Sequence, residues 1–395
     1  MPMLSERTRA ADASAQPFLR FYSTSRYADR RFEPGIADFT FGNPQEMPLP
    51  GFVAALGAAI EPRDMNWFAY KTSEDEPRAF LAEHVGRELG LDFAPDDFAL
   101  TAGAFAAIAL AFRLVLDAGD EAIFAEPAWF CYEPMLLAAD TVPVKVRLRG
   151  PRFDLDLAAI AAAITPRTRL VIVNTPHNPT GRIYGRAELE ALADVLDRAS
   201  ARIGRRIFLL SDEPYRRLRF DENAFVSPAA VYPWTLVSYS YGKVLLTPGQ
   251  RLGYLALSPL MPSGERRVIA GATLAAQMAL GWNFASAVMQ HAIPALEDLS
   301  IDLPAFTRRR DRLMGVLAEA GYAPLLPEGT FYLFAGWPPG DPEVHWNRLA
   351  DHDVFVMPGS VMGAPDHFRI SLTASDAMVE KAVPAFLAAG AAPTG

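Results

Sequence analysis

The sequence has very little cysteine and lysine, and both shortages limit what the protein can be. Cys131 is the only cysteine in 395 residues, which excludes an intramolecular disulfide and a zinc site built on paired cysteines. The six histidines do not cluster, so no structural metal site is expected. Only Lys71, Lys145, Lys243 and Lys381 are lysines among 37 basic residues, so each lysine needs a chemical explanation.

Other features are missing as well. The N-terminus is polar and charged where a signal peptide needs an apolar core, and no apolar run has the length of a membrane span. Neither GxGxxG nor GxxxxGK[ST] occurs, which leaves a dinucleotide or nucleoside triphosphate without its usual binding loop. The net charge of -9 argues against a nucleic-acid partner, which requires a basic face. We expect a cytoplasmic protein with no membrane or nucleic-acid partner.

What is present is a globular composition with 51% hydrophobic residues. Between residues 121 and 257, short apolar runs alternate with helical patterns, which is typical of βαβ units around a mainly parallel sheet. Because the runs are continuously apolar, we expect strands that are buried on both faces. The expected strands are Glu121–Ala125, Val142–Val146, Leu170–Asn174, Ile207–Ser211, Leu236–Ser240 and Tyr254–Leu257.

The pattern changes after Trp282, where long helical stretches lead into short strands separated by turns. We interpret residues 51–285 as a large α/β domain with helices flanking the sheet, and residues 286–395 as a smaller α+β domain. Residues 1–50 are expected to form a tail of about fifteen residues, followed by an extended segment that packs on the small domain.

Reactive side chains follow three of the expected strands. Asn178 lies in the first of these loops, Asp212 and Tyr215 follow the next strand, and Lys243 follows the third. Each has a simpler interpretation: the PHNPTG loop as a turn, Asp212 as a helix N-cap, Lys243 as a solvated charge. Parallel strands, however, present their ligands at their carboxyl ends. The shared position of these residues therefore favours a binding site.

Phe98–Phe112 reads as a strand, a Thr-Ala-Gly turn and an Ala-rich helix. The start of such a helix suits an anion, although an ordinary glycine turn before a buried helix has the same pattern. An anion site, a guanidinium, a carboxylate, a phenol and a lysine together suit a phosphorylated aromatic ring that forms an imine. Arginine is too poor a nucleophile for that bond, whereas lysine forms it. This chemistry explains why residue 243 is a lysine.

Over most of its length the sequence resembles the fold-type I pyridoxal-phosphate (PLP) aminotransferases of class I/II, which implies an aspartate-aminotransferase-like fold. Ser240, Lys243, Gly249 and Arg251 match the imine motif of that family in residue type and spacing. The resemblance implies that Lys243 forms a Schiff base with PLP and then acts as a catalytic base. It also implies that Ser240 and Arg251 hold the phosphate of the cofactor.

The resemblance extends to the groups around the cofactor ring. Asn178 and Tyr215 match residues that hydrogen-bond its phenolic oxygen. Asp212 matches the aspartate that keeps the pyridine nitrogen protonated and so makes the ring an electron sink. Trp129 matches an aromatic residue that stacks on the ring, with an ordinary core tryptophan as the alternative. Asp212 and Tyr215 are therefore expected to be catalytic together with Lys243.

Gly103, Ala104 and Phe105 match the turn whose backbone amides bind the phosphate. Tyr70 resembles the tyrosine that reaches the phosphate of the neighbouring subunit, which implies a homodimer with shared active sites. Two departures stand out. Gly242 replaces the usual serine before the lysine, and the segment after Tyr70 lacks the usual glycine.

On the substrate side, Arg369 matches the arginine that pairs with the α-carboxylate, where a two-pronged donor suits a carboxylate. Gly42 and Asn178 are expected to bind the substrate beside it. Phe105 occupies a position where an aspartate-using branch has a lysine, which favours a neutral or aromatic substrate side chain. An arginine from the partner subunit leaves dicarboxylates open.

These matches imply transfer of an amino group from an L-α-amino acid to a 2-oxo acid. Other fold-type I PLP reactions use the same residues, so β-elimination (as in a C–S lyase), decarboxylation and amino-acid oxidation stay as alternatives. Arg369 disfavours decarboxylation because it holds the carboxylate in place. A regulator on this fold would normally carry a DNA-binding module, and a dehydrogenase would need the missing glycine fingerprint.

Overall fold

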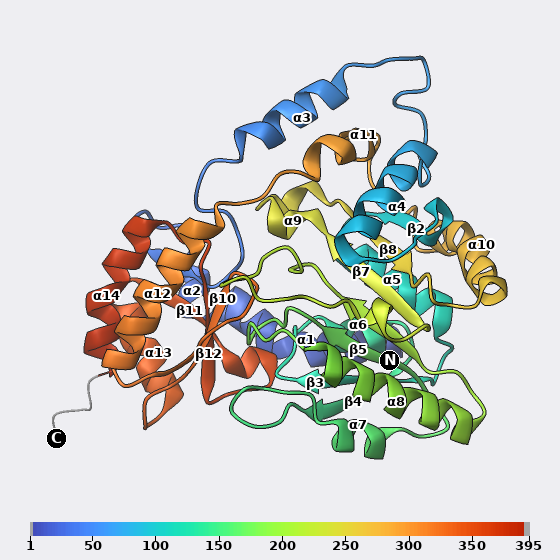
Figure 1. Cartoon of the computed structure of the whole chain (residues 1–395). Coiled ribbons are helices and arrows are strands. Elements are labelled where there is room, and N and C mark those ends of the chain that lie inside the picture. Colours follow the sequence, from blue (N-terminus) through green and yellow to red (C-terminus); the bar gives the residue numbers. More distant parts are fainter. Residues whose placement is uncertain (1–2, 391–395) are drawn as a thin grey trace.

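The computed structural model describes residues 3–390, which form two β-sheets flanked by helices (Figure 1). The larger sheet has seven strands in the order β2-β8-β7-β6-β5-β3-β4. Its members are β2 (Phe98–Thr101), β3 (Glu121–Glu126), β4 (Val142–Arg147), β5 (Thr168–Asn174), β6 (Phe208–Asp212), β7 (Thr235–Ser240) and β8 (Gly253–Leu257). Strand β8 runs antiparallel to both of its neighbours, β2 and β7, and the other pairs in this sheet are parallel. The predicted mainly parallel sheet is confirmed.

Helices cover both faces of this sheet because its side chains alternate and both sets are apolar. Val171 and Val173 of β5 pack with α8 (Arg186–Ile203), whereas Ile172 between them packs with α5 (Ala104–Val115) on the other face. The remaining helices around this sheet are α4 (Asp75–Leu89), α6 (Tyr132–Ala138), α7 (Leu157–Ala163), α9 (Tyr241–Val244) and α10 (Ser263–Ala279). Helix α10 was not expected from the sequence.

The smaller sheet has five strands in the order β1-β11-β12-β10-β9. They are β1 (Ala37–Phe39), β9 (Ala323–Leu325), β10 (Tyr332–Gly336), β11 (Val354–Pro358) and β12 (His367–Ser371). Strand β1 pairs in parallel with β11, so the N-terminal segment joins the C-terminal sheet. The helices on this side, orange and red in Figure 1, are α12 (Leu303–Glu319), α13 (Pro342–Asp351) and α14 (Asp376–Gly390).

One hydrophobic cluster runs between the two sheets and includes Tyr239 of β7 and Ile370 of β12. Helix α3 (Pro50–Ile60) contributes to the same cluster, together with α11 (Ala287–Leu296). The core is therefore continuous where the chain passes from one sheet to the other. The division of the chain near residue 285 stays a prediction.

The N-terminal tail is the part of the prediction that the structure corrects. Helix α1 spans Glu6–Thr24, and α2 (Arg26–Arg30) follows it. The Ser5 hydroxyl caps α1 by accepting from the Thr8 N–H, which satisfies one of the free donors at its start. Farther along, Phe18 stacks on Phe130 with ring centroids 4.3 Å apart. This aromatic contact anchors α1, whose first half is polar, beside the start of α6.

No helix within residues 3–390 is long and apolar enough to cross a membrane.

Candidate active site

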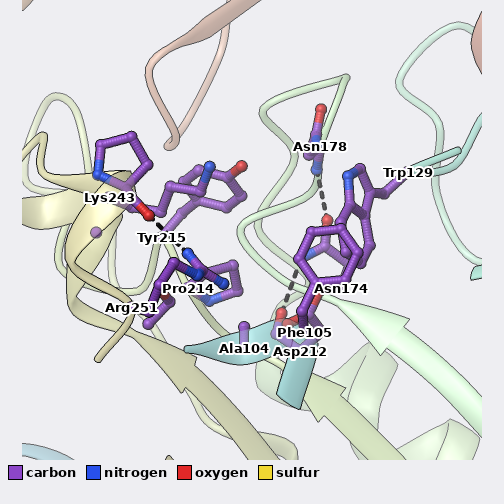
Figure 2. A pocket seen from close by; sticks show the side chains of 13 residues that line it. Ala104, Phe105, Trp129, Asn174, Asn178, Asp212, Pro214, Tyr215, Lys243 and Arg251 are labelled. Carbon is purple, nitrogen blue, oxygen red and sulfur yellow. Dashed lines mark hydrogen bonds between the residues drawn. The ribbon is translucent and has the colours of Figure 1, made fainter. Parts of the chain in front are cut away.

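A cavity lies at the carboxyl edge of the larger sheet, where β5, β6 and β7 end beside the start of α5. Its lining residues are Ala104, Phe105, Trp129, Asn174, Asn178, Asp212, Pro214, Tyr215, Ser240, Gly242, Lys243, Pro248 and Arg251. Lys243 and Tyr215 lie on one side of it, and Trp129, Phe105 and Asn174 lie on the other (Figure 2). Nine of the sequence-predicted residues thus meet at one place, because most of them end or follow a strand or begin a helix at this edge.

Asp212 ends β6 and is buried at the base of the cavity. Its Oδ2 atom accepts a hydrogen bond of 2.5 Å from the Tyr132 hydroxyl. Its Oδ1 atom is buried and has no hydrogen-bond partner within residues 3–390. Burial raises the pKa of Asp212 to about 6, although Tyr132, Ser238 and the charge of Lys243 oppose this. An unpaired buried carboxylate oxygen is costly, so the position suits a ligand with a positively charged N–H group.

Arg251 and the start of α5 form the opposite end of the cavity. The Arg251 guanidinium donates to the Pro248 carbonyl at 2.7 Å and has no carboxylate partner in the described chain. Burial lowers its pKa. Gly103 caps α5 with φ +82°, and a Cβ there would lie 2.6 Å from Arg251 Nη2. The glycine therefore lets a guanidinium approach the free N–H groups of a helix start, which is an arrangement suited to an anion such as a phosphate.

Lys243 lies in α9, directly after β7. Its Nζ atom is 5.7 Å from the ring centre of Tyr215 and 5.8 Å from that of Phe331. Within residues 3–390 this amine has no hydrogen bond or ion pair, although it lines the cavity. Ser240 is buried at the end of the same strand and lines the cavity as well.

The structure explains the departure at Gly242. A Cβ on this residue would lie 2.9 Å from the Pro248 Cα atom, which is backbone and cannot easily move. A serine is therefore excluded by the close approach of the Thr247–Gly249 turn.

Arg369 lies in β12 and is buried beside the cavity. Its Nη1 atom donates to Asn178 Oδ1 at 2.9 Å, and its Nη2 atom donates to the Thr40 carbonyl at 2.9 Å. Its Nε atom is buried without a partner within residues 3–390. A guanidinium has five N–H donors, so a forked edge is left for a carboxylate. The Tyr332 ring lies against Arg369. Gly42 lies near the same tyrosine, because a Cβ on it would approach the Tyr332 hydroxyl to 2.7 Å.

Tyr70 is a predicted site residue that does not line this cavity. Its side chain is 92% exposed, and its ring contacts that of Trp282 at 5.4 Å between centroids. In a single chain it therefore contributes nothing to the site described here. Its role in a partner's site stays a prediction.

Three residues of the site were missed from the sequence. Asn174 bridges two loops, because its side chain accepts from the Asn178 N–H at 2.7 Å and donates to the Asp212 carbonyl at 2.8 Å. Tyr132 holds Asp212, and Tyr332 lies against Arg369. The position of Asn174 at a strand end was a usable signal, whereas the two tyrosines sit among other aromatic residues and gave none.

The residues present fit PLP. A phosphate matches the unpaired Arg251 at the start of α5, and a pyridinium N–H matches the orphaned Oδ1 of Asp212. The Trp129 side chain faces the space between them, and Lys243 offers an amine without a partner. No group of three or more metal-ligating side chains is found in the part of the chain that the structure describes.

Comparison with known proteins agrees with this chemistry. A family model described as aminotransferase class I and II matches residues 36–386. The aspartate/prephenate aminotransferase of Thermus thermophilus is 33% identical over 362 residues, which cover 90% of this chain and 91% of the relative. An aminotransferase structure from Eubacterium rectale aligns with a TM-score of 0.89 at 29% identity and covers 98% of both chains. The aspartate aminotransferase of Thermus thermophilus with maleate aligns with a TM-score of 0.81 at 28% identity, over 98% of this chain and 100% of that one.

The chain therefore belongs to the class I and II aminotransferase family. It is a PLP-dependent aminotransferase with an aspartate-aminotransferase-like fold. The family, fold class and reaction predicted from the sequence are confirmed.

Proposed function

We propose that this enzyme transfers the amino group of an L-α-amino acid to a 2-oxo acid, with Lys243 holding PLP as a Schiff base. The observation that carries this proposal is the set of unpaired groups around one cavity. Lys243, Arg251 and Arg369 have no acidic partner in the described chain, and Asp212 keeps one buried oxygen without a donor. Each of these groups has a counterpart on PLP or on an amino acid.

The chain's own residues divide the binding work. Arg251 and the N–H groups at the start of α5 would hold the phosphate, together with Ser240, which lines the same cavity. The Asp212 carboxylate would hold the proton on the pyridine nitrogen, and Tyr132 fixes the orientation of that carboxylate. Asn178 and Tyr215 would bind the phenolic oxygen, and Trp129 would stack on the ring. When bound, PLP supplies an electron sink that makes the α-hydrogen of an attached amino acid acidic.

Lys243 moves the proton. As a free amine, its neutral Nζ would remove the hydrogen from the substrate Cα atom. Arg369 holds the substrate carboxylate and so orients the Cα–H bond towards Lys243. Asn178 joins the two ends of the site, because its Oδ1 accepts from Arg369 while its amide N–H groups stay available to a ligand. The sequence of residues around the cavity thus supports transamination in preference to loss of the carboxylate.

We further propose a homodimer with shared sites and a cytoplasmic location. Support for the dimer comes from exposed apolar side chains near Tyr70, since Met65 is 95% exposed and Phe68 and Trp282 are also exposed. In such a dimer Tyr70 would reach the phosphate end of the neighbouring site. Sedimentation velocity tests the assembly, and a fully active monomer would contradict the shared sites. A chain with one cysteine suits a reducing compartment.

The visible spectrum of the protein reconstituted with PLP tests the proposed reaction. Amino acids are added singly, without any 2-oxo acid, and the absorbance of the Schiff base is followed. Loss of the yellow band with release of the matching 2-oxo acid is the expected result, and it identifies the donor. A band that survives every amino acid, or release of ammonia or carbon dioxide, would replace transamination with another PLP reaction.

A further inference from the structure

Tyr332 is a buried aromatic residue that touches the site at several points and has no assigned role. It is the first residue of β10 and is 3% exposed. Strand β10 pairs antiparallel with β12, where Phe334 lies opposite Arg369. Because side chains alternate along a strand, Tyr332 lies on the same face as Phe334 and is a diagonal neighbour of Arg369. The register of two strands therefore places this ring beside the guanidinium.

The ring lies against the guanidinium itself. The Arg369 Cζ atom is 3.9 Å from the centroid of the Tyr332 ring. Hydrogen bonds to Asn178 and Thr40 hold two edges of the same guanidinium, so the ring supports its flat face. A guanidinium stacked on an aromatic ring is stabilised without using any of its N–H donors. The donors that a carboxylate needs are therefore left available.

The hydroxyl group of Tyr332 lies in the same polar region. It is close enough to Gly42 that a Cβ there would approach it to 2.7 Å, and its ring lies 6.0 Å from that of Tyr215. Burial by itself raises the pKa of Tyr332, but the positive charges of Arg369 and Lys243 and hydrogen bonding with Tyr215 lower it overall. Both cations of the catalytic side thus face this side chain.

We infer that Tyr332 is a positioning residue for the substrate carboxylate, because its ring fixes the plane and reach of Arg369. The inference rests on the proposed function, in which Arg369 binds that carboxylate. It assigns the effect to the aromatic ring. Binding of the carboxylate should therefore be retained when phenylalanine replaces Tyr332 and weakened when an aliphatic residue does. It also confines the effect to ligands that carry a carboxylate.

Two small amines, one with a carboxylate and one without, test whether the effect depends on the carboxylate. 2-Aminoisobutyrate binds as an amino acid but has no α-hydrogen to lose, and isopropylamine is the same molecule without the carboxylate. Both are titrated into the PLP-reconstituted enzyme, and the dissociation constants are read from the change in the Schiff base absorbance. The wild type is compared with Tyr332→Phe and Tyr332→Leu, and Tyr332→Met is the second aliphatic variant in case the leucine variant does not fold.

We expect the aliphatic variants to bind 2-aminoisobutyrate on the order of tenfold more weakly and isopropylamine as the wild type does. Tyr332→Phe should stay within about threefold of the wild type for both ligands. Unchanged binding of 2-aminoisobutyrate in the aliphatic variants would overturn the inference, and so would equal weakening of both ligands or a Tyr332→Phe variant as weak as Tyr332→Leu. A wild-type absorbance that responds to neither amine would overturn the proposed function, and the inference with it.

Discussion

Two groups of arginine side chains that are buried or partly buried in this protein differ in whether a carboxylate forms an ion pair with them. Away from the cavity, Arg216, Arg309 and Arg310 are buried, and each forms ion pairs with acidic side chains. At the cavity, Arg251 and Arg369 form none within residues 3–390. A buried charge without a partner is unfavourable. The contrast teaches that the first group stabilises the fold, whereas the second group is kept for an anion that arrives from solution.

The lysines show the same division. Lys71, Lys145 and Lys381 each form an ion pair with a nearby carboxylate. Lys243 is the lysine that lines the cavity and forms none in the described chain. Among the lysines, the one cation without a carboxylate partner in the described chain is thus the one at the cavity.

The largest effect is expected at the unpaired lysine. Lys243→Ala should lower the rate of amino transfer by at least about a thousandfold, because the side chain supplies both the nucleophile and the base. The matched control is Lys381→Ala, which removes a surface ion pair and should keep wild-type activity. Single-turnover rates and circular dichroism measure activity and folding. Substantial residual transfer in a folded Lys243→Ala protein would exclude the catalytic role.

At a paired arginine, stability should change and binding should not. Glu88→Gln removes the charge that lies 2.9 Å from Arg216 Nη2 and leaves that guanidinium with Glu213 at 3.9 Å. We expect the free energy of unfolding to fall by about 2 kcal/mol, because a buried cation loses its main partner. Urea denaturation measures this loss, and steady-state kinetics should give an unchanged KM. A raised KM with unchanged stability would contradict the division.

At the unpaired arginines the opposite result is expected. Arg251→Lys should weaken PLP binding about tenfold, and Arg369→Lys should raise the KM of the 2-oxo acid about tenfold, because an ammonium cannot replace a forked donor. Fluorescence titration of the apoenzyme with PLP and steady-state kinetics separate the two constants. Arg310→Lys is the control and should alter neither. If each variant changed both constants equally, the two arginines would not serve separate anions.

The last prediction concerns the unpaired carboxylate, and its effect depends on pH. In the apoenzyme, burial raises the pKa of Asp212 from 3.8 to about 6. Between these values the folded state binds more protons than the unfolded state, so this residue lowers stability as the pH rises from 4 towards 7. Asp212→Asn cannot ionise and should lack this contribution. The difference in unfolding free energy between the two proteins should therefore change by about 2 kcal/mol across that range.

Urea denaturation at several pH values, with and without PLP, measures this difference. PLP should reverse its sign at neutral pH, because the ligand brings a positive charge to Asp212. If the unfolding free energies of the wild type and Asp212→Asn differed by the same amount at every pH, burial would not raise the pKa of Asp212.

The seven-stranded sheet and most of the site were predictable from the sequence because they depend on local patterns. Apolar runs gave the strands, and the ends of β5, β6 and β7 placed Asn178, Asp212 and Lys243 at one edge. Helix α1 was not predictable in this way, because its first half is polar and its aromatic residues are buried only by partners distant in the sequence.

Residues that act by supporting others were also missed. Tyr132 and Tyr332 look like ordinary core aromatics in the sequence. Their roles follow from contacts with residues distant in the sequence: Tyr132 contacts Asp212, 80 residues away, and Tyr332 contacts Arg369. The exclusion of serine at Gly242 likewise depends on Pro248 folding back over it. Such effects are set by tertiary distances, which spacing along the chain does not report.

The hydrogen bond between Arg369 and Asn178 has a consequence for how this enzyme can evolve. It joins the residue proposed to hold the substrate carboxylate to one proposed to touch the cofactor. Residues in one hydrogen-bond network do not respond independently to substitution. Changes at these two positions are therefore epistatic, and a lineage that acquires a new substrate through Arg369 must adjust the cofactor environment through Asn178 as well.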